Sequence, residues 1–423
     1  MVVRLDFTSE AFFRDPPKAI AKLRMSGPVI PTRFPFIGKV WITTTHDATA
    51  QVLKDDATYT LRREDGDVAG LRWWMPNFVR TIANNMLTMD EPDHTRLRSI
   101  VDEAFRRRAI VAMEPRIRSI ADGLADELFA EGSPADVVQR YARILPLAVI
   151  CELLGLPPAD RPKFIAWGNT MSSLTNVVSF FRMLLAFRKM RAYLEQRLQI
   201  AREQGGEGLI ADLIEVEREG GQITPDEVVS MAFLLLAAGS ETTTHLISGS
   251  AYELLRSPSL RDRLEQDWNR VGLAVEEFLR FVSPVQFSKP RYVRRDDVVE
   301  GVRLKKGDRV MVMLAAANMD PTVHDRPKDL DLERKPNRHI SFGTGIHFCL
   351  GHQLARIEAA CALEALFARW PKLGLAVDPA HVHWRRRPGL RAIAKLPVTP
   401  EGRATQATAR TEASIDRSLT TAG

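Results

Sequence analysis

The sequence predicts a mainly α-helical protein with a smaller β portion. Apolar residues recur at helical spacing through most of the chain, and the longest such segment is Pro225–Arg256. Strand-like patterns are confined to two regions, 38–44 and 291–312, where Gly301 and Gly307 mark turns. The 423 residues are 45% hydrophobic and 26% charged, which is ordinary globular composition and enough for a large core.

The interior of the chain contains no Gly/Ser-rich or Pro-rich linker and no internal repeat, so we expect one domain over residues 1–398. Residues 399–423 are polar and poor in core-forming side chains, which predicts a disordered tail. The N-terminus has no long apolar run, so neither a signal peptide nor a membrane anchor is expected. Three cysteines without a disulfide pattern indicate a reducing, cytoplasmic location.

A formal charge of +6 is modest for a chain of this length, and it does not by itself indicate a nucleic-acid partner. The basic clusters lack interleaved aromatic residues and carry no nucleic-acid-binding motif. We therefore do not expect a nucleic-acid partner.

Helical periodicity predicts further helices besides the longest one, at 92–108, 114–131, 162–204 (broken at least once), 260–281 and 350–370. The longest helix begins with a capping-box pattern, because Thr224 and Glu227 flank a proline at the first helical position. At 1.5 Å per residue this helix would span about 48 Å. Residues 231–238 are apolar on every face, which predicts that this part is buried all round.

The middle of that helix is unusual, because residues 239–245 read Gly-Ser-Glu-Thr-Thr-Thr-His. Hydroxyl side chains compete for backbone hydrogen bonds and glycine weakens a helix. We therefore expect a local distortion, of the kind that often marks a functional site. An exposed polar stretch on a half-buried helix is the alternative.

The most informative segment is 342–351, Phe-Gly-Thr-Gly-Ile-His-Phe-Cys-Leu-Gly. Its glycines permit tight turns with positive φ, and the loop delivers Cys349 to the start of the predicted helix 350–370. Free N–H groups and the helix dipole at that position favour a thiolate.

Three interpretations of this loop remain open from the residues alone. Cys349 could be a packing residue, since free cysteines are usually small core residues. It could join His347 and His352 in a zinc site, although no C-x-x-C pair is present. It could also be the single axial thiolate of a haem iron.

Several separated motifs decide among these interpretations, because together they resemble the cytochrome P-450 superfamily in its soluble bacterial form. The loop 342–351 resembles the haem-binding signature of that family, and residues 238–242 resemble its oxygen-activating segment. Glu277 and Arg280 resemble its buried Glu-x-x-Arg pair, and residues 317–321 resemble a common family stretch with Met319 where arginine is usual. The resemblance covers about residues 28–398.

The resemblance implies a cytochrome P-450 fold, with haem b between the long central helix and the cysteine-bearing loop. It implies that Cys349 is the axial ligand of the haem iron, that Thr242 and Glu241 manage oxygen and protons, and that further residues bind the haem. The further haem-binding positions are His94, Arg98, Arg291 and His347 for the propionates, with Phe342, Gly343, Ala238 and Gly239 along the macrocycle. Gly239 would leave room for dioxygen.

Two other groups of residues follow from the same resemblance. Glu277, Arg280 and Arg334 are expected to form a structural ion network behind the haem. The substrate pocket is expected to be mostly apolar, formed by Trp74, Met75, Phe78, Val285, Phe287 and Leu390.

The implied activity is that of a monooxygenase, which inserts one atom of O2 into an apolar small molecule, most simply by hydroxylation. The sequence has no flavin or iron–sulfur motif, so electrons would come from an external ferredoxin and an NAD(P)H-dependent ferredoxin reductase. A basic docking face could be formed by Arg106, Arg107, Arg108, Arg338 and Arg356. A peroxygenase or a phenol-coupling member of the family is the alternative, and a haem-based sensor or binding protein is the alternative of another class.

Overall fold

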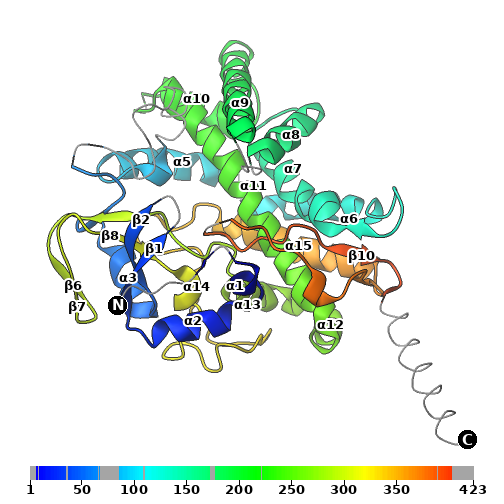
Figure 1. Cartoon of the computed structure of the whole chain (residues 1–423). Coiled ribbons are helices and arrows are strands. Elements are labelled where there is room, and N and C mark those ends of the chain that lie inside the picture. The colour runs from blue at the N-terminus through cyan, green and yellow to red at the C-terminus, as the bar shows by residue number, and fades with distance from the viewer. Residues whose placement is uncertain are drawn as a thin grey trace, which may run out of the picture.

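In a computed structural model of the chain, the structure describes residues 6–7, 9–34, 37–64, 66, 85–107, 110–171, 177–220, 222–387 and 389–402. The fold class predicted from the sequence is confirmed, because helices dominate and the strands form small sheets beside them (Figure 1). Among the described residues, no helix is both long and apolar enough to cross a membrane.

Helix α11 (Pro225–Arg256) runs through the middle of the molecule, and the other helices are arranged around it (Figure 1). It begins at the predicted capping box, in which Thr224 Oγ1 accepts from the Glu227 amide and the Glu227 carboxylate accepts from the Thr224 amide. Helices α7 (Ile144–Leu153), α9 (Val177–Gln204), α13 (Val271–Val282) and α15 (His352–Arg369) pack directly against it.

The other α-helices complete the bundle and the region around the largest sheet. They are α1 (Glu10–Arg14), α2 (Pro16–Arg24), α3 (His46–Lys54), α5 (Asp93–Arg107), α6 (Glu114–Asp126), α8 (Arg161–Met171), α10 (Leu209–Arg218), α12 (Pro258–Glu265) and α14 (Leu314–Ala317). Short helical turns connect them at η1 (Met86–Thr88), η2 (Ile110–Met113), η3 (Val138–Ala142), η4 (Pro158–Asp160), η5 (Trp268–Arg270) and η6 (Pro379–His381).

Most of the predicted helices are found near their predicted bounds, including the two helices α8 and α9 within 162–204. The prediction of one helix over 260–281 was wrong. The chain forms α12, η5 and α13 there, because the Asp267 side chain accepts a hydrogen bond from the Asn269 amide and starts a new turn. Helix α6 ends at Asp126, earlier than the predicted 131.

The largest sheet has the order β1-β2-β8-β5-β3, formed by β1 (Val29–Phe34), β2 (Gly38–Thr43), β8 (Arg309–Val312), β5 (Arg291–Val293) and β3 (Tyr59–Thr60). β2 and β8 are parallel, with Trp41 opposite Val310, and the other pairs are antiparallel. The predicted region 291–312 also contains the hairpin of β6 (Asp297–Val299) and β7 (Val302–Leu304). Glu300 and Gly301 turn this hairpin with φ of 43° and 80°.

A third sheet, which the sequence did not predict, joins distant parts of the chain in the order β4-β10-β9. Its strands are β4 (Ala135–Asp136), β10 (Pro397–Thr399) and β9 (Gly374–Leu375). Thr399 pairs with Gly374 at the end of β10, and residues 403–423 of the predicted tail lie outside the described residues.

Candidate functional site

The loop that carries Cys349 is held by its own backbone. The amide of Gly343 donates to Ile340 O at 2.9 Å, and the amide of Cys349 donates to Phe342 O at 3.0 Å. Gly345 has φ of 75°, and a Cβ at this position would lie 2.4 Å from the carbonyl oxygen of Leu53. Only glycine fits there, so the sequence of the loop fixes where the cysteine is presented.

The surroundings of Cys349 do not favour a thiolate by themselves. Burial raises the pKa of its thiol, and this effect outweighs the Gly351 amide and the charges of Arg98 and Arg356, which lower it. Helix α15 begins at His352, so the sulfur precedes the first helical residue instead of lying within the first turn. The Gly351 amide therefore favours the anion, as the sequence predicts, but it does not outweigh burial. A cation bound to the sulfur would reverse this balance.

Four of the predicted haem-binding residues supply buried or half-buried nitrogen groups from three separate elements. His94 and Arg98 lie on α5, Arg291 on β5 and His347 in the cysteine loop. The His94 and His347 rings are in contact, with centroids 4.3 Å apart. Arg98 donates to Phe348 O at 2.7 Å, so α5 is tied to the residue before Cys349.

Several nitrogens of this cluster have no hydrogen-bond partner among the described residues. They are both ring nitrogens of His94, Nε2 of His347 and Nε of Arg291. Burial lowers the pKa of His94 and Arg291, and burial together with the nearby positive groups lowers the pKa of His347 to about 3. Each unpaired buried donor costs about 1–3 kcal/mol. An anionic group would accept hydrogen bonds from the N–H groups among them, so the cluster fits the two propionates of haem.

On α11, Ala238 is exposed although Leu236 and Thr243 on either side of it are buried. Thr242 lies one turn further along the same face. This open, small-residue face fits a flat group such as the haem macrocycle. Gly239 points elsewhere, because a Cβ there would lie 3.6 Å from Ile150 Cδ1 on α7. The room that Gly239 leaves is therefore on the α7 side of the helix.

The expected distortion of α11 was also wrong. The helix is continuous through 239–245, and its hydroxyls donate to the carbonyl four residues earlier: Ser240 to Leu236, Thr242 to Ala238, Thr243 to Gly239 and Thr244 to Ser240. Because the side chains bond back to the helix, they do not compete with its backbone ladder.

Glu241 forms an ion pair with Arg387, which lies near the C-terminal end of the described chain. Nε2 of His245 lies 3.9 Å from the nearer Glu241 oxygen, too far for a hydrogen bond. Burial raises the pKa of Glu241, but His245, Arg387 and Arg385 together hold it below its ordinary value. The carboxylate is therefore ionised at neutral pH.

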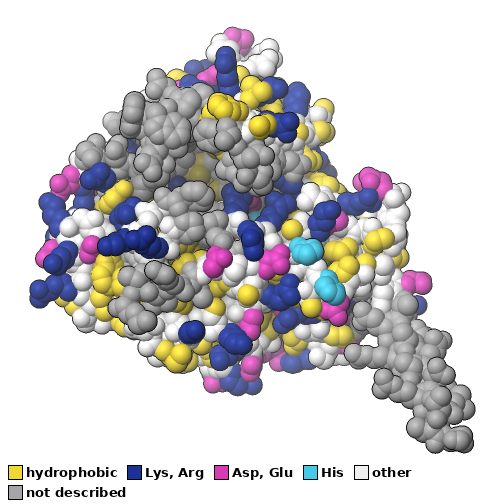
Figure 2. Space-filling view, viewed as in Figure 1, with side chains coloured by type: hydrophobic (Ala, Val, Ile, Leu, Met, Phe, Trp, Pro, Cys, Tyr) yellow, Lys and Arg dark blue, Asp and Glu magenta, His cyan; other side chains and the backbone are white. Residues whose placement is uncertain are grey.

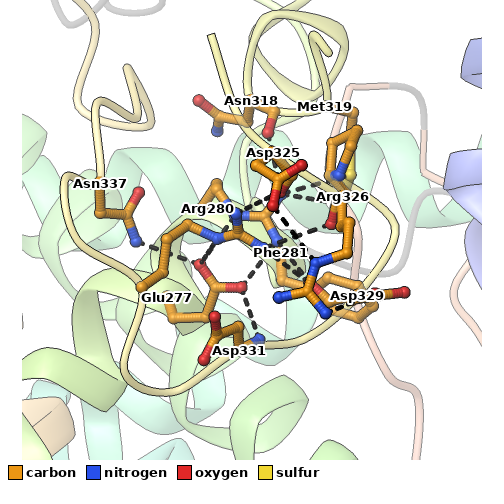
Figure 3. A network of polar contacts seen from close by, with 12 residues as sticks. Glu277, Arg280, Phe281, Asn318, Met319, Asp325, Arg326, Asp329, Asp331 and Asn337 are labelled. Atoms are coloured by element: carbon orange, nitrogen blue, oxygen red, sulfur yellow. Dashed lines mark hydrogen bonds and ion pairs between the residues drawn. The ribbon is translucent and has the colours of Figure 1, made fainter.

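The predicted ion network is present, and it extends beyond the three predicted residues (Figure 3). Arg280 makes two bonds to the Glu277 carboxylate, at 2.8 and 2.7 Å, and both side chains are fully buried. Arg334 Nε lies 3.0 Å from Glu277 Oε2. The Asp331 amide and the Asn337 side chain also donate to this carboxylate.

The residues predicted for the substrate pocket separate into three groups. Val285 and Leu390 are brought together by an isolated bridge. Phe287 instead packs into an aromatic cluster, 5.1 Å from both the Phe7 and Phe34 rings, and is 5% exposed. Trp74, Met75 and Phe78 lie outside the described residues.

Glu358 is a buried carboxyl on α15 that the sequence reading missed. Burial raises its pKa to about 8, and it interacts with Thr243 of α11. Its position next to the apolar run 359–363 of the predicted helix was the available signal. Among the described residues, no group of three or more His, Cys, Asp or Glu side chains is placed to hold a metal ion, so the zinc interpretation gains no support.

The raised pKa of Glu358 predicts how stability varies with pH. The Glu358 carboxyl has a pKa of about 8 in the folded protein and an ordinary value of 4.5. Its contribution to the free energy of unfolding is therefore fully present below about pH 4.5 and is lost as the pH rises toward 8. At pH 8 Glu358→Gln should therefore unfold at a higher denaturant concentration than the parent. The expected difference in the free energy of unfolding is on the order of 3–5 kcal/mol. The two proteins should converge near pH 5. A constant difference at both pH values would contradict a buried neutral carboxyl.

Comparison with known proteins places these features in a family. A family model described as cytochrome P-450 matches residues 180–371. The polyketide biosynthesis cytochrome P-450 PksS of Bacillus subtilis is 36% identical over 379 residues, covering 87% of this chain and 90% of the relative. The vitamin D(3) 25-hydroxylase of Pseudonocardia autotrophica is 38% identical over 400 residues, covering 93% and 96%.

Solved structures agree with the sequence comparison. The structure of PksS from Bacillus subtilis superposes with a TM-score of 0.85 at 34% identity and covers 94% of this chain and 100% of its own. A myxobacterial cytochrome P-450 in complex with myristic acid superposes with a TM-score of 0.83 at 35% identity, covering 93% and 98%. The chain therefore belongs to the cytochrome P-450 family and is a haem b monooxygenase.

Proposed function

We propose that this monooxygenase hydroxylates an apolar small molecule, using Cys349 as the axial ligand of its haem iron. The observation that carries the assignment of the site is the convergence of the cysteine loop with a cluster of buried, unpartnered donors. Arg98 physically links the two through Phe348 O. Bound haem would supply the activation of O2, which no side chain of the chain can perform alone.

The chain's own residues would have three tasks. His94, Arg98, Arg291 and His347 would bind the propionates, while Phe342, Gly343 and Ala238 would line the macrocycle. Thr242 would give up its bond to Ala238 O, which is 2.8 Å long, to hold a water molecule on the oxygen side. Glu241, ionised and paired with Arg387, would accept protons from solvent and pass them toward Thr242.

The substrate is proposed to be apolar and of moderate to large size. The named relatives act on or bind such molecules: one belongs to polyketide biosynthesis, one hydroxylates vitamin D(3), and one is bound to myristic acid. Val285 and Leu390, which meet at an isolated bridge, would contribute to the pocket.

The experiment that tests the function uses purified protein with a ferredoxin, its reductase and NADPH. Candidate substrates are first titrated for shifts of the haem Soret band, and those that shift it are incubated with O2. Product should form only with the full electron-transfer system and should carry one atom of labelled O2. Product formed with hydrogen peroxide alone would favour a peroxygenase, and coupled phenols without oxygen incorporation would favour the phenol-coupling alternative.

The role of Thr242 predicts a loss of coupling. Thr242→Ala removes the hydroxyl, so NADPH consumption should continue while the fraction of electrons recovered as product falls about tenfold or more. Ser250→Ala is the matched control, because Ser250 on the same helix also donates to the carbonyl four residues earlier, at 2.7 Å. Equal coupling in the two variants would exclude a role for Thr242 in proton management.

We propose that electrons arrive from a ferredoxin in the cytoplasm, through a basic face. Arg338 is exposed, whereas Arg356 is bound to Glu276 and stacks on the Phe342 ring, 4.6 Å away, so its charge is compensated. The side chains of Arg106, Arg107 and Arg108 lie outside the described residues. On the face drawn in Figure 2, basic and acidic side chains are interspersed.

Neutralising Arg106, Arg107 and Arg108 together should slow reduction by ferredoxin at low salt, and the difference should shrink as salt rises, because exposed charges are screened. Arg356→Gln, which removes a compensated charge, is the comparison variant. Stopped-flow reduction rates measured as a function of ionic strength test whether these charges bind the ferredoxin. Unchanged rates at every salt concentration would remove the basic face from the proposal.

A further inference from the structure

A cavity of about 300 Å³ lies between α7, α8, α9 and α11, and the segment with Arg385 and Arg387 lines part of it. It lies beside a different face of α11 from the one proposed to face the haem. Ser240, Glu241 and Thr244 line it, whereas Ala238 and Thr242 do not. The cavity therefore lies on a different face of α11 from the proposed haem side, but it shares Glu241 and Arg387 with the site described above.

The polar wall of this cavity carries more positive than negative charge. Arg143, Arg385 and Arg387 line it, and Glu241 is the carboxylate that lines it within the described residues. Glu241 is already paired with Arg387. The Arg385 side chain has no hydrogen-bond or ion-pair partner among the described residues. Arg143 and Arg385 are close enough for repulsion between them to lower the pKa of Arg143, in addition to the effect of burial.

His245 provides an independent indication of a ligand. It lines the cavity, is 4% exposed, and neither of its ring nitrogens has a hydrogen-bond partner among the described residues. A buried imidazole without partners is costly in the free protein. An acceptor bound in the cavity would take the hydrogen bond of its N–H group, and a negative charge on that acceptor would offset the repulsion between the two guanidiniums.

The rest of the wall is apolar, with Leu147, Phe164, Met183 and Phe187 among its residues. A volume of about 300 Å³ is at the small end for ligand sites. From this geometry we propose that the cavity binds a medium-chain carboxylate, with its carboxylate at Arg143, Arg385 and His245 and its alkyl chain against α8 and α9. This proposal does not depend on the role assigned to Glu241.

The test measures binding of octanoate to the haem-loaded protein by calorimetry, with octanol as the neutral match. An azole that ligates the haem iron is present at saturation, so that the substrate side is blocked. Octanoate should still bind, and at least about tenfold more tightly than octanol, because a charge-assisted bond to Arg is lost in the alcohol.

Arg385→Gln should weaken octanoate binding by about ten- to hundredfold, because it removes the cation without a described partner. Arg386→Gln is the matched control, because Arg386 is adjacent to Arg385 but is exposed and does not line the cavity. This variant should bind octanoate like the parent. Arg143→Gln, measured in the same way, decides the result if Arg385→Gln does not fold. Equal affinity for octanoate and octanol, loss of binding under the azole, or equal effects of the 385 and 386 substitutions would overturn the proposal.

Discussion

Cys349→Ser is expected to lose the red-shifted Soret band of the reduced, carbon monoxide-bound protein, together with all monooxygenase activity. The sulfur lies in a loop whose backbone bonds, such as Cys349 N to Phe342 O, do not involve the side chain. A serine hydroxyl is a far weaker donor to iron, and thiolate donation is what favours cleavage of the O–O bond. The chain should therefore remain folded, while the bound haem loses the red-shifted Soret band and the monooxygenase activity.

Cys361→Ala is the control for this experiment. Cys361 lies on the same helix, α15, and is 1% exposed within the core. Its substitution should cost some stability through lost packing but should leave the thiolate spectrum intact. A red-shifted band in Cys349→Ser, or its loss in Cys361→Ala, would assign the ligand elsewhere. Circular dichroism on both variants separates loss of ligation from loss of fold.

The features that the sequence predicted well are those whose physics is local. The start of α11 follows from Thr224, a proline and Glu227 within four residues, and these suffice to cap a helix. The turn of the cysteine loop likewise follows from glycines a few residues apart. The break at Asp267 is also local, but an Asp within an otherwise helical pattern is too common to predict it.

The features that the sequence missed depend on residues far apart in the chain. Glu241 is paired with Arg387, which no spacing rule connects to it. Phe287 was assigned to the pocket by the family resemblance, yet it packs against the Phe7 and Phe34 rings in the core. The Gly351 amide lowers the pKa of the Cys349 thiol, as its chain neighbours predict, but the larger effect of burial by distant elements was not visible in the sequence. Tertiary packing decides each of these cases.

Glu277→Gln is expected to destabilise the protein by about 3–5 kcal/mol. Arg280 donates from all three nitrogens: to Glu277 twice, to Asn318 O at 3.0 Å, to Pro327 O at 2.8 Å and to Asp329 O at 2.9 Å. These bonds connect α13 to the 318–329 segment (Figure 3). Removing the Glu277 charge leaves the guanidiniums of Arg280 and Arg334 without the carboxylate that they share.

The neighbouring residue on α13 provides a closely matched control. Glu276 also pairs with an arginine, Arg356, but its side chain is 28% exposed. Solvent can replace part of that interaction, so Glu276→Gln should cost only about 1 kcal/mol. Denaturant midpoints of the haem-loaded proteins measure both, and haem retention during unfolding shows whether the network supports the haem side of the core.

The ordering among variants is the sharper test, because the network is coupled. Arg334 is 7% exposed on its side chain, and Arg334→Met leaves the Glu277–Arg280 pair intact, so it should cost less than Glu277→Gln. Glu277→Leu combined with Arg280→Leu removes both charges together and should cost less than the sum of the two single substitutions, since neither ion is then left buried alone. Additive effects would mean that the pair contributes through packing, and a Glu277→Gln protein as stable as Glu276→Gln would show that the buried charges are not energetically coupled.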